Sequence, residues 1–99
     1  MVKLIMSWNI EPGQENEHFE FFIQEFVPGL SEIGIQTSDA WYTLYGDYPK
    51  ILAGALADDL ESLRQAFATQ EWQRLKARLL TYVSDYEQKV VRASGGFQL

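Results

Sequence analysis

The chain has 99 residues, of which 46% are hydrophobic and 14% aromatic, so we expect one domain over residues 1–99 with its own core. It has no cysteine, which excludes disulfides, thiolate metal sites and a cysteine nucleophile and fits a cytoplasmic protein. The net charge of −6 disfavours nucleic acid as a partner, because an acidic domain repels phosphates. The sequence predicts neither a membrane span, which needs ~18 apolar residues, nor a signal peptide.

The spacing of hydrophobic side chains predicts the first two elements. Residues 2–10 carry apolar side chains at every even position, which is typical of a strand with one buried face. A helix is expected over roughly residues 14–27, because five hydrophobic residues form one stripe: Phe19, Phe22, Ile23, Phe26 and Leu30. Pro28-Gly29 indicates its end. Phe21 points away from this stripe, so we expect it to be exposed or covered from outside the monomer.

The middle of the chain predicts a hairpin. Residues 40–45 are rich in aromatic and β-forming side chains, after a connection over residues 34–38. Residues 46–50 carry turn signals, and residues 51–57 form a second short strand. We therefore expect two antiparallel strands joined by a five-residue loop.

The last third predicts helix and then strand. Asp59 and Thr69 are expected N-caps, and the segments that follow them form either two helices or one bent helix. The second hydrophobic stripe runs from Trp72 to Val83, and residues 86–92 form a last strand. The order βαββαβ predicts an α+β fold of the split βαβ type, with helices on one face of a four-stranded antiparallel sheet.

The open face of such a sheet predicts a homodimer. Helices cover one face only, yet the hairpin carries bulk on both sides, with Trp41 and Tyr45 on one and Tyr42 and Leu44 on the other. A second copy of the sheet is the simplest cover, by two-fold symmetry. The alternative is an aromatic face that stays exposed to water.

At this point the chain resembles the dimeric α+β barrel superfamily, which has the ferredoxin-like fold. More narrowly, it resembles the small domains of NIPSNAP proteins and antibiotic-biosynthesis monooxygenases. The resemblance covers nearly the whole chain, and three segments carry it: the opening strand that runs into Glu11-Pro12-Gly13, the aromatic strand and turn over residues 41–48, and the paired helices from Asp58 and Thr69. It implies a barrel of two sheets, with a pocket between sheet and helices in each subunit.

Members of this superfamily include monooxygenases and isomerases without a cofactor, haem-degrading enzymes and proteins of unknown activity. The haem-degrading type uses an asparagine on an early strand, an aromatic residue and a histidine on the second helix. Asn9 and Trp72 match the first two, but the only histidine, His18, lies on the first helix. We therefore expect no haem, and no other cofactor.

Five residues are the candidate lining of a ligand pocket, because aromatic walls with a few polar groups are typical of small-molecule sites. They are Trp8, Asn9, Trp41, Tyr45 and Trp72. The competing interpretation is that these side chains belong to the core and the dimer interface. RNA-recognition domains share the element order, but the basic aromatic motif of their central strands is missing here.

His18 is the one side chain whose ordinary pKa lies near neutrality, which makes it the candidate acid or base. Its position among Glu15, Glu17 and Glu20 favours a solvated histidine instead. We expect no metal site, because Glu15 and His18 have no third ligand. The sequence therefore predicts a homodimer that binds a small apolar or aromatic molecule, with a monooxygenase or isomerase reaction as one extension. The alternative is a catalytically inert dimeric interaction or structural protein.

Overall fold

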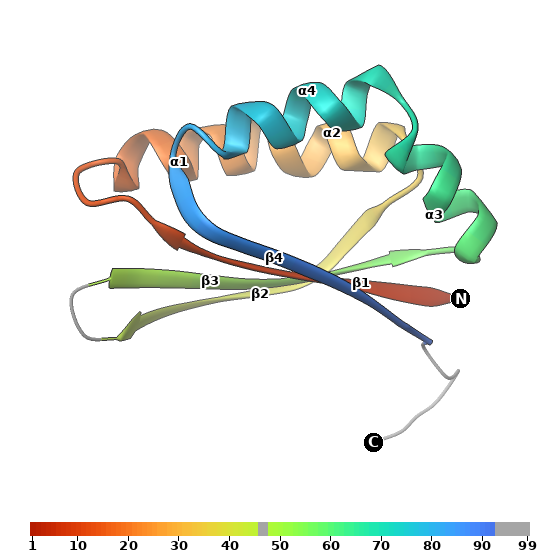
Figure 1. Ribbon diagram of the computed structural model, residues 1–99, viewed down its shortest axis with the longest axis horizontal. Helices are drawn as coiled ribbons and strands as arrows, with labels where there is room; N and C mark the ends of the chain where they lie inside the picture. The colour runs from red at the N-terminus through yellow and green to blue at the C-terminus, as the bar shows by residue number, and fades with distance from the viewer. Residues whose placement is uncertain (46–47, 93–99) are drawn as a thin grey trace.

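The computed structural model of the chain describes residues 1–45 and 48–92, which fold into one sheet covered by helices (Figure 1). The elements follow in the order β1 (Val2–Ile10), α1 (Glu15–Phe21), η1 (Phe22–Phe26), α2 (Val27–Glu32), β2 (Gln36–Tyr45), β3 (Tyr48–Ala57), α3 (Leu60–Phe67), α4 (Gln70–Leu79) and β4 (Val83–Arg92). None of the helices in this part of the chain is both long enough and apolar enough to span a membrane.

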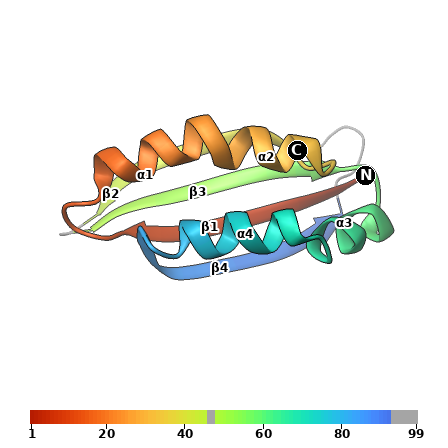
Figure 2. The same cartoon turned by 90° about the horizontal axis from the view of Figure 1, so that it is seen from above.

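The four strands form an antiparallel sheet in the order β2-β3-β1-β4. All helices lie on one face of this sheet, and the other face carries none of them (Figure 1). Seen from above, α1 and α2 run over the β2–β3 half, whereas α4 runs over β1 and β4 (Figure 2). This arrangement confirms the predicted α+β, ferredoxin-like fold with helices on one face.

The first helical segment is longer than predicted and contains a wide turn. Pro28 and Gly29 do not end it, because the helix continues through η1, a π-helical turn, into α2. In η1 the Val27 N–H donates to the carbonyl of Phe22, five residues back. Pro28 has no N–H to donate, and a widened turn directly before it is one way for a helix to accommodate a proline. The helix ends at Glu32 with Ile33 as its C-cap, and Gly34 follows with a φ of +89° that suits glycine.

The π turn shifts the buried face of this helix by one residue. A π turn inserts one extra residue, so side chains before it are rotated by about 100° relative to a regular helix. Phe26 and Leu30 are buried as predicted, but upstream the buried residues are His18 and Phe21, whereas Ile23 is 67% exposed. The prediction that Phe21 lies outside the monomer core was therefore wrong, and so was the prediction of a solvated His18.

The remaining elements differ from prediction mainly at their ends. Asp59 and Thr69 are N-caps as predicted, because their side-chain oxygens accept hydrogen bonds from the backbone N–H of Ser62 and Trp72, at 2.7 and 3.0 Å. Two capped helices therefore follow each other. Residues 48–50 belong to β3 and not to a five-residue loop, and the turn residues 46–47 lie outside the described part. The α4 helix ends at Leu79, and β4 begins at Val83.

The helix-covered face of the sheet supplies most of the core. The even positions of β1 are buried as predicted, from Leu4 to Ile10. Beside them, β3 contributes small side chains such as Ala53 and Ala55, which let the helices approach the sheet closely. The α2 and α4 helices approach each other at Gly29, where a Cβ atom would meet the Leu75 side chain.

Candidate functional site

The five predicted pocket residues do not meet in one pocket. Trp8 and Trp72 are buried on the helix-covered side. Trp41 is 54% exposed and pairs with Leu52 of β3. Trp8 pairs with the preceding residue of the same strand, Ile51. Neighbouring residues of a strand point to opposite faces, so Trp41 and Trp8 project from opposite sides of the sheet. The side chain of Tyr45 lies outside the described part of the structure.

Asn9 and Trp72 each have a structural partner away from Trp8. The Asn9 amide nitrogen donates to a carboxylate oxygen of Asp85 at 2.9 Å, in an exposed contact between β1 and β4. Trp72 packs against Phe67, with ring centroids 4.7 Å apart, where α3 and α4 meet. These contacts account for both side chains without a ligand.

Trp8 instead forms the centre of an aromatic cluster between the helices and the sheet. Its indole is fully buried, and four rings from three elements lie 5.9–6.0 Å from it, centroid to centroid: His18, Phe22, Phe26 and Tyr86. The Trp8 and Tyr86 rings are stacked, with 13° between their planes. We call these five residues, together with Phe19, the Trp8 cluster.

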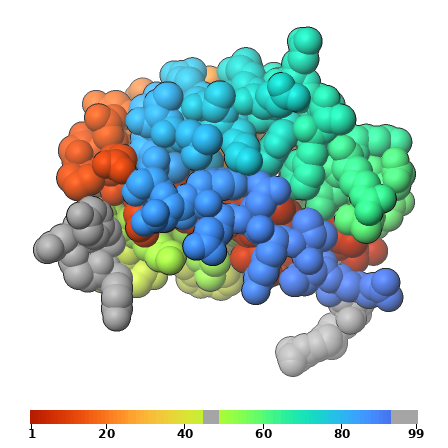
Figure 3. All heavy atoms as spheres, viewed as in Figure 1, coloured from red at the N-terminus to blue at the C-terminus, as the bar shows by residue number. Residues whose placement is uncertain are grey.

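An irregularity in strand pairing places Tyr86 under Trp8. The register between β1 and β4 shifts between Ser7 and Asn9, and Asp85 takes a positive φ of 54° at this point. A bulge of this kind re-aims the following side chain. Burial raises the pKa of the Tyr86 phenol, and the ammonium of Lys76 lies 5.1 Å from the centre of its ring. The atoms of α4 and β4 meet on this side of the molecule (Figure 3).

His18 is the only buried polar side chain among the described residues, and it lies inside this cluster. The Trp8 indole Nε1–H donates to His18 Nε2 at 2.9 Å. Burial lowers the pKa of His18 from 6.5 to about 4, so the imidazole is neutral at pH 7. An indole nitrogen can only donate, so Nε2 carries the lone pair and the single ring proton resides on Nδ1.

His18 Nδ1 is buried and has no hydrogen-bond partner among the described residues. The rings of Phe19 and Phe22 lie against the imidazole, with centroids at 4.7 and 5.9 Å. Both phenylalanines are only partly buried, so they form the outer wall of the Trp8 cluster. A buried donor without an acceptor costs roughly 1–3 kcal/mol, and in the described part of the chain Thr37 Oγ1 is the other buried side-chain atom without a partner.

The protonation pattern limits what His18 can do. Nε2 already accepts a hydrogen bond, and Nδ1 has no lone pair to take a proton or bind a metal. Its available chemistry is donation of one N–H, so the predicted acid or base role has no geometric support here and stays a prediction. Within residues 1–45 and 48–92, no group of three histidine or carboxylate side chains could hold a metal ion.

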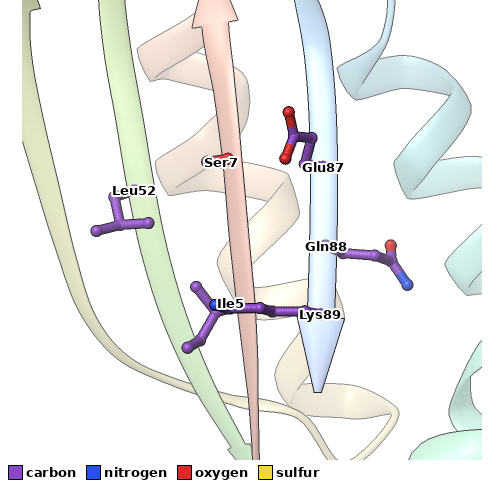
Figure 4. Close-up of a pocket in the computed structure, with 6 residues that line it drawn as sticks. All are labelled: Ile5, Ser7, Leu52, Glu87, Gln88 and Lys89. Carbon is purple, nitrogen blue, oxygen red and sulfur yellow. The ribbon is translucent and has the colours of Figure 1, made fainter. Parts of the chain in front are cut away.

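Two surface hollows lie away from the Trp8 cluster. One of about 410 Å³ is lined mainly from the open face of the sheet (Figure 4), by Ile5, Ser7, Leu52, Glu87, Gln88 and Lys89. The other, of about 450 Å³, is a groove around the end of α2 and α3 with Glu32, Asp58, Ser62, Gln65 and Thr69 among its lining residues. Among the described side chains, neither hollow is lined by Trp8, Trp41 or Trp72.

The open face combines exposed apolar side chains with one ion pair. Trp41 and Leu52 are paired across β2 and β3, and Leu52 is 41% exposed. Lys3 and Asp39 form an ion pair at 3.6 Å that spans β3. Gly54 lies between them, and a Cβ atom there would collide with both side chains. This glycine therefore lets the ion pair lie flat on the sheet.

Comparisons with known proteins identify the fold. Neither a protein-family model nor a curated protein matches the sequence. Among solved structures, an Arabidopsis thaliana protein superposes with a TM-score of 0.77 at 11% identity, over 99% of this chain and 100% of that one. An uncharacterised NIPSNAP domain protein from Burkholderia xenovorans gives a TM-score of 0.73 at 15% identity, over 99% of both chains.

A proposed antibiotic biosynthesis monooxygenase from Deinococcus radiodurans gives a TM-score of 0.72 at 12% identity, over 100% of this chain and 98% of that one. The chain has the fold of these NIPSNAP and monooxygenase-like domains. This confirms the resemblance at the level of the fold, and at these identities it carries no reaction and no ligand over to this chain.

Sequence reasoning missed the pairing of His18 with Trp8. One signal for it was present, because His18, Phe21 and Phe22 have helical spacing and Pro28 interrupts the helix downstream. A proline inside a helical pattern allows a π turn, which changes the phase of everything before it.

Proposed function

We propose that the protein is a homodimer, joined through the open faces of its sheets, in which each subunit binds a small apolar or aromatic molecule at the Trp8 cluster. The observation that carries the ligand is His18 Nδ1, a buried donor without an acceptor inside a shell of aromatic rings. Small-molecule sites combine apolar walls with a few placed polar groups, and the Trp8 cluster has this composition.

The dimer is supported by the exposed apolar side chains of the open face. Trp41, Leu52 and Val91 are 54%, 41% and 37% exposed. Four strands of about ten residues cover roughly 33 × 19 Å, or about 600 Å² before side-chain relief is counted. A standard interface buries about 800 Å² per partner, a value that this flat projected area reaches only when the relief of the side chains is added.

The experiment that tests this proposal is a native mass spectrum of the gently purified protein. We expect the mass of a dimer with additional small-molecule mass, and that extra mass is lost in a His18→Phe variant. A bare dimer, together with no uptake of added naphthalene or 2-acetylnaphthalene, would contradict the binding function. A monomer at micromolar concentration would contradict the dimer.

The second candidate function is a catalytically inert dimeric interaction protein. The observation that favours it is the close packing of the helix–sheet layer, where Trp8 and His18 have no exposed surface. Under this alternative the protein is a dimer that takes up neither aromatic probe. The reaction classes implied by the family resemblance, a cofactor-independent monooxygenase or isomerase, stay predictions, and we assign no chemical step to the described residues.

A further inference from the structure

The hollow on the open face of the sheet is apolar toward β3 and charged toward β4. Its apolar lining comes from Leu52 of β3 and Ile5 of β1, and its polar lining includes Ser7, Glu87 and Lys89 (Figure 4). Glu87 and Lys89 are two residues apart on one strand, so their side chains share this face. A cavity of ~150 Å³ holds a benzene ring, so a hollow of about 410 Å³ has room for a large aromatic side chain.

A large aromatic side chain projects from the same face, one strand away from the hollow. Trp41 of β2 pairs with Leu52, Leu52 pairs with Ser7, and Ser7 pairs with Glu87. Residues that lie opposite each other in antiparallel strands point to the same face, so these four form one row across the sheet. The Trp41 side chain is 54% exposed and does not line the hollow of its own chain. The open face therefore carries a projection beside a recess.

Two such faces can be joined so that each projecting ring meets the other subunit's hollow. The required two-fold axis lies between the sheets and runs along β3, because β3 separates Trp41 on β2 from the middle of the hollow on β1. This axis leaves the strand directions of the two sheets aligned, and packed sheets in proteins keep them within about 30° of each other. The symmetry then makes the insertion twice, once in each direction.

The charges around the hollow complement the groups beside Trp41. Asp39 shares the face of Trp41, and the ladder joins its row across β3 and β1 to Lys89 on β4. Under the same axis the Asp39 carboxylate, which also pairs with Lys3 of its own chain at 3.6 Å, approaches Lys89 of the partner subunit. The carboxylate of Glu87 borders the hollow in the row of Trp41, and an indole N–H needs such an acceptor because it can only donate.

Resting on the dimer proposed above, we infer that the open faces join as projection and recess. Trp41 of each subunit inserts into the hollow of the other, where its ring packs on Ile5 and Leu52 of the partner subunit. Its indole N–H donates to Glu87 of the partner subunit. The occupant of the hollow is thus a side chain of a second copy of this chain, and Trp41 is the residue that selects this pairing.

The first test compares two neighbouring aromatic residues that are equally exposed. Trp41 is 54% exposed on the open face and Tyr42 is 52% exposed, but Tyr42 pairs with the buried Ile51 and projects from the helix-covered face. Buried tryptophans are the strongest anchors of interfaces, so we expect Trp41→Ala to raise the dimer Kd by about 30-fold or more. We expect Tyr42→Ala to leave it unchanged.

Analytical ultracentrifugation measures the Kd of both variants and of the unaltered chain, and circular dichroism verifies the fold. An unchanged Kd in Trp41→Ala, or equal weakening by both changes, would overturn the inference and leave the dimer standing. A monomeric unaltered chain would overturn both the inference and the proposed dimer.

The second test moves the aromatic ring from the projection into the recess. Ser7→Phe fills the hollow from within its own chain, so we expect it to weaken the dimer by blocking the Trp41 ring of the partner subunit. The double variant Trp41→Ala/Ser7→Phe has neither projection nor recess, and we expect it to dimerise more tightly than either single variant. A double-mutant cycle measures this coupling. Additive losses would overturn the insertion of Trp41 into this hollow.

A third test needs no substitution and decides the inference even if the variants do not fold. The chain has three tryptophans, and in the single chain Trp8 and Trp72 are buried whereas Trp41 is exposed. We expect acrylamide to quench Trp41 at concentrations below the dimer Kd and to reach no tryptophan well above it. A tryptophan that stays equally accessible in the dimer would overturn the inference.

Discussion

At the scale of single residues, the pair of Trp8 and His18 is a polar contact inside an apolar layer. Each side chain satisfies one polar atom of the other, so removing either partner leaves a buried group unpaired. The sequence shows both residues but not their pairing, because they are ten positions apart and the wrong helix face was predicted to be buried. Local periodicity cannot reveal a contact that depends on helix phase.

The contact between these two residues predicts a strong coupling in stability. In a His18→Leu variant the Trp8 N–H stays buried without an acceptor, which costs about 1–3 kcal/mol in the free energy of unfolding, and loss of the unpaired Nδ1–H offsets part of this cost. Trp8→Phe should then cost less in the His18→Leu background than in the unaltered chain. Urea unfolding of the four proteins measures this coupling. Strictly additive losses would mean that the two side chains do not interact.

The lowered pKa of His18 predicts a pH dependence with a definite sign. The pKa is about 4 in the folded chain against 6.5 for an unperturbed histidine, so the unfolded chain binds more protons between these values. The contribution of His18 to the free energy of unfolding is complete above pH 6.5. It is lost as the pH falls from 6.5 to about 4, by on the order of 2 kcal/mol. Unfolding measured at several pH values checks this, with His18→Leu as the control. Both proteins carry the same carboxylates, so the effect of carboxylate titration cancels in the difference between them. A difference between the two proteins that does not change with pH would contradict it.

At the scale of elements, the strands and the helix caps were predictable because their signals are local. The alternation along β1 and the capping side chains of Asp59 and Thr69 act over a few residues, and the structure confirms them. The π turn η1 was not predictable in this way. The stripe from Phe19 to Leu30 fits a regular helix well, and the inserted residue shows only in the structure, in the Val27–Phe22 hydrogen bond and the burial of His18 and Phe21.

The inserted residue predicts a difference between two single-residue deletions. Removing the exposed Gln24 shortens η1 to a regular turn and keeps His18 and Phe21 in phase with Phe26, so the chain should remain folded with the Trp8–His18 pair intact. Removing the exposed Glu20 instead rotates His18 by about 100° and should cost at least the 1–3 kcal/mol of the broken pair. Thermal unfolding and the histidine ¹⁵N spectrum compare them. Equal damage from both deletions would contradict this account of η1.

At the scale of the whole molecule, helices cover only one face of the sheet. The helices bury the Trp8 side, while the other side keeps large apolar residues next to a flat ion pair between Lys3 and Asp39. The sequence predicted bulk on both faces of the hairpin, and the structure places Trp41 and Leu52 side by side on the open one. The occupant of that face was argued from symmetry alone, because residue patterns show that a face is apolar and not what covers it.

The proposed dimer predicts opposite outcomes for two equally exposed leucines. Leu52 is 41% exposed on the open face of the sheet. Leu80 is 45% exposed and is the C-cap of α4, on the helix-covered side. Two-fold symmetry places Leu52→Glu in the interface twice, so two unpaired carboxylates would be buried per dimer. Each would cost several kcal/mol, and the dimer should dissociate at micromolar concentration. Leu80→Glu should leave the dimer intact.

Light scattering coupled to size-exclusion chromatography measures both variants at matched concentration, and circular dichroism verifies that each remains folded. A folded Leu52→Glu monomer beside a Leu80→Glu dimer would support pairing through the open face, since the two changes add the same charge at similar exposure. A Leu52→Glu protein that stays dimeric would rule out this face as the contact. Dissociation by Leu80→Glu alone would place the contact on the helix side, where the outer wall of the Trp8 cluster also lies.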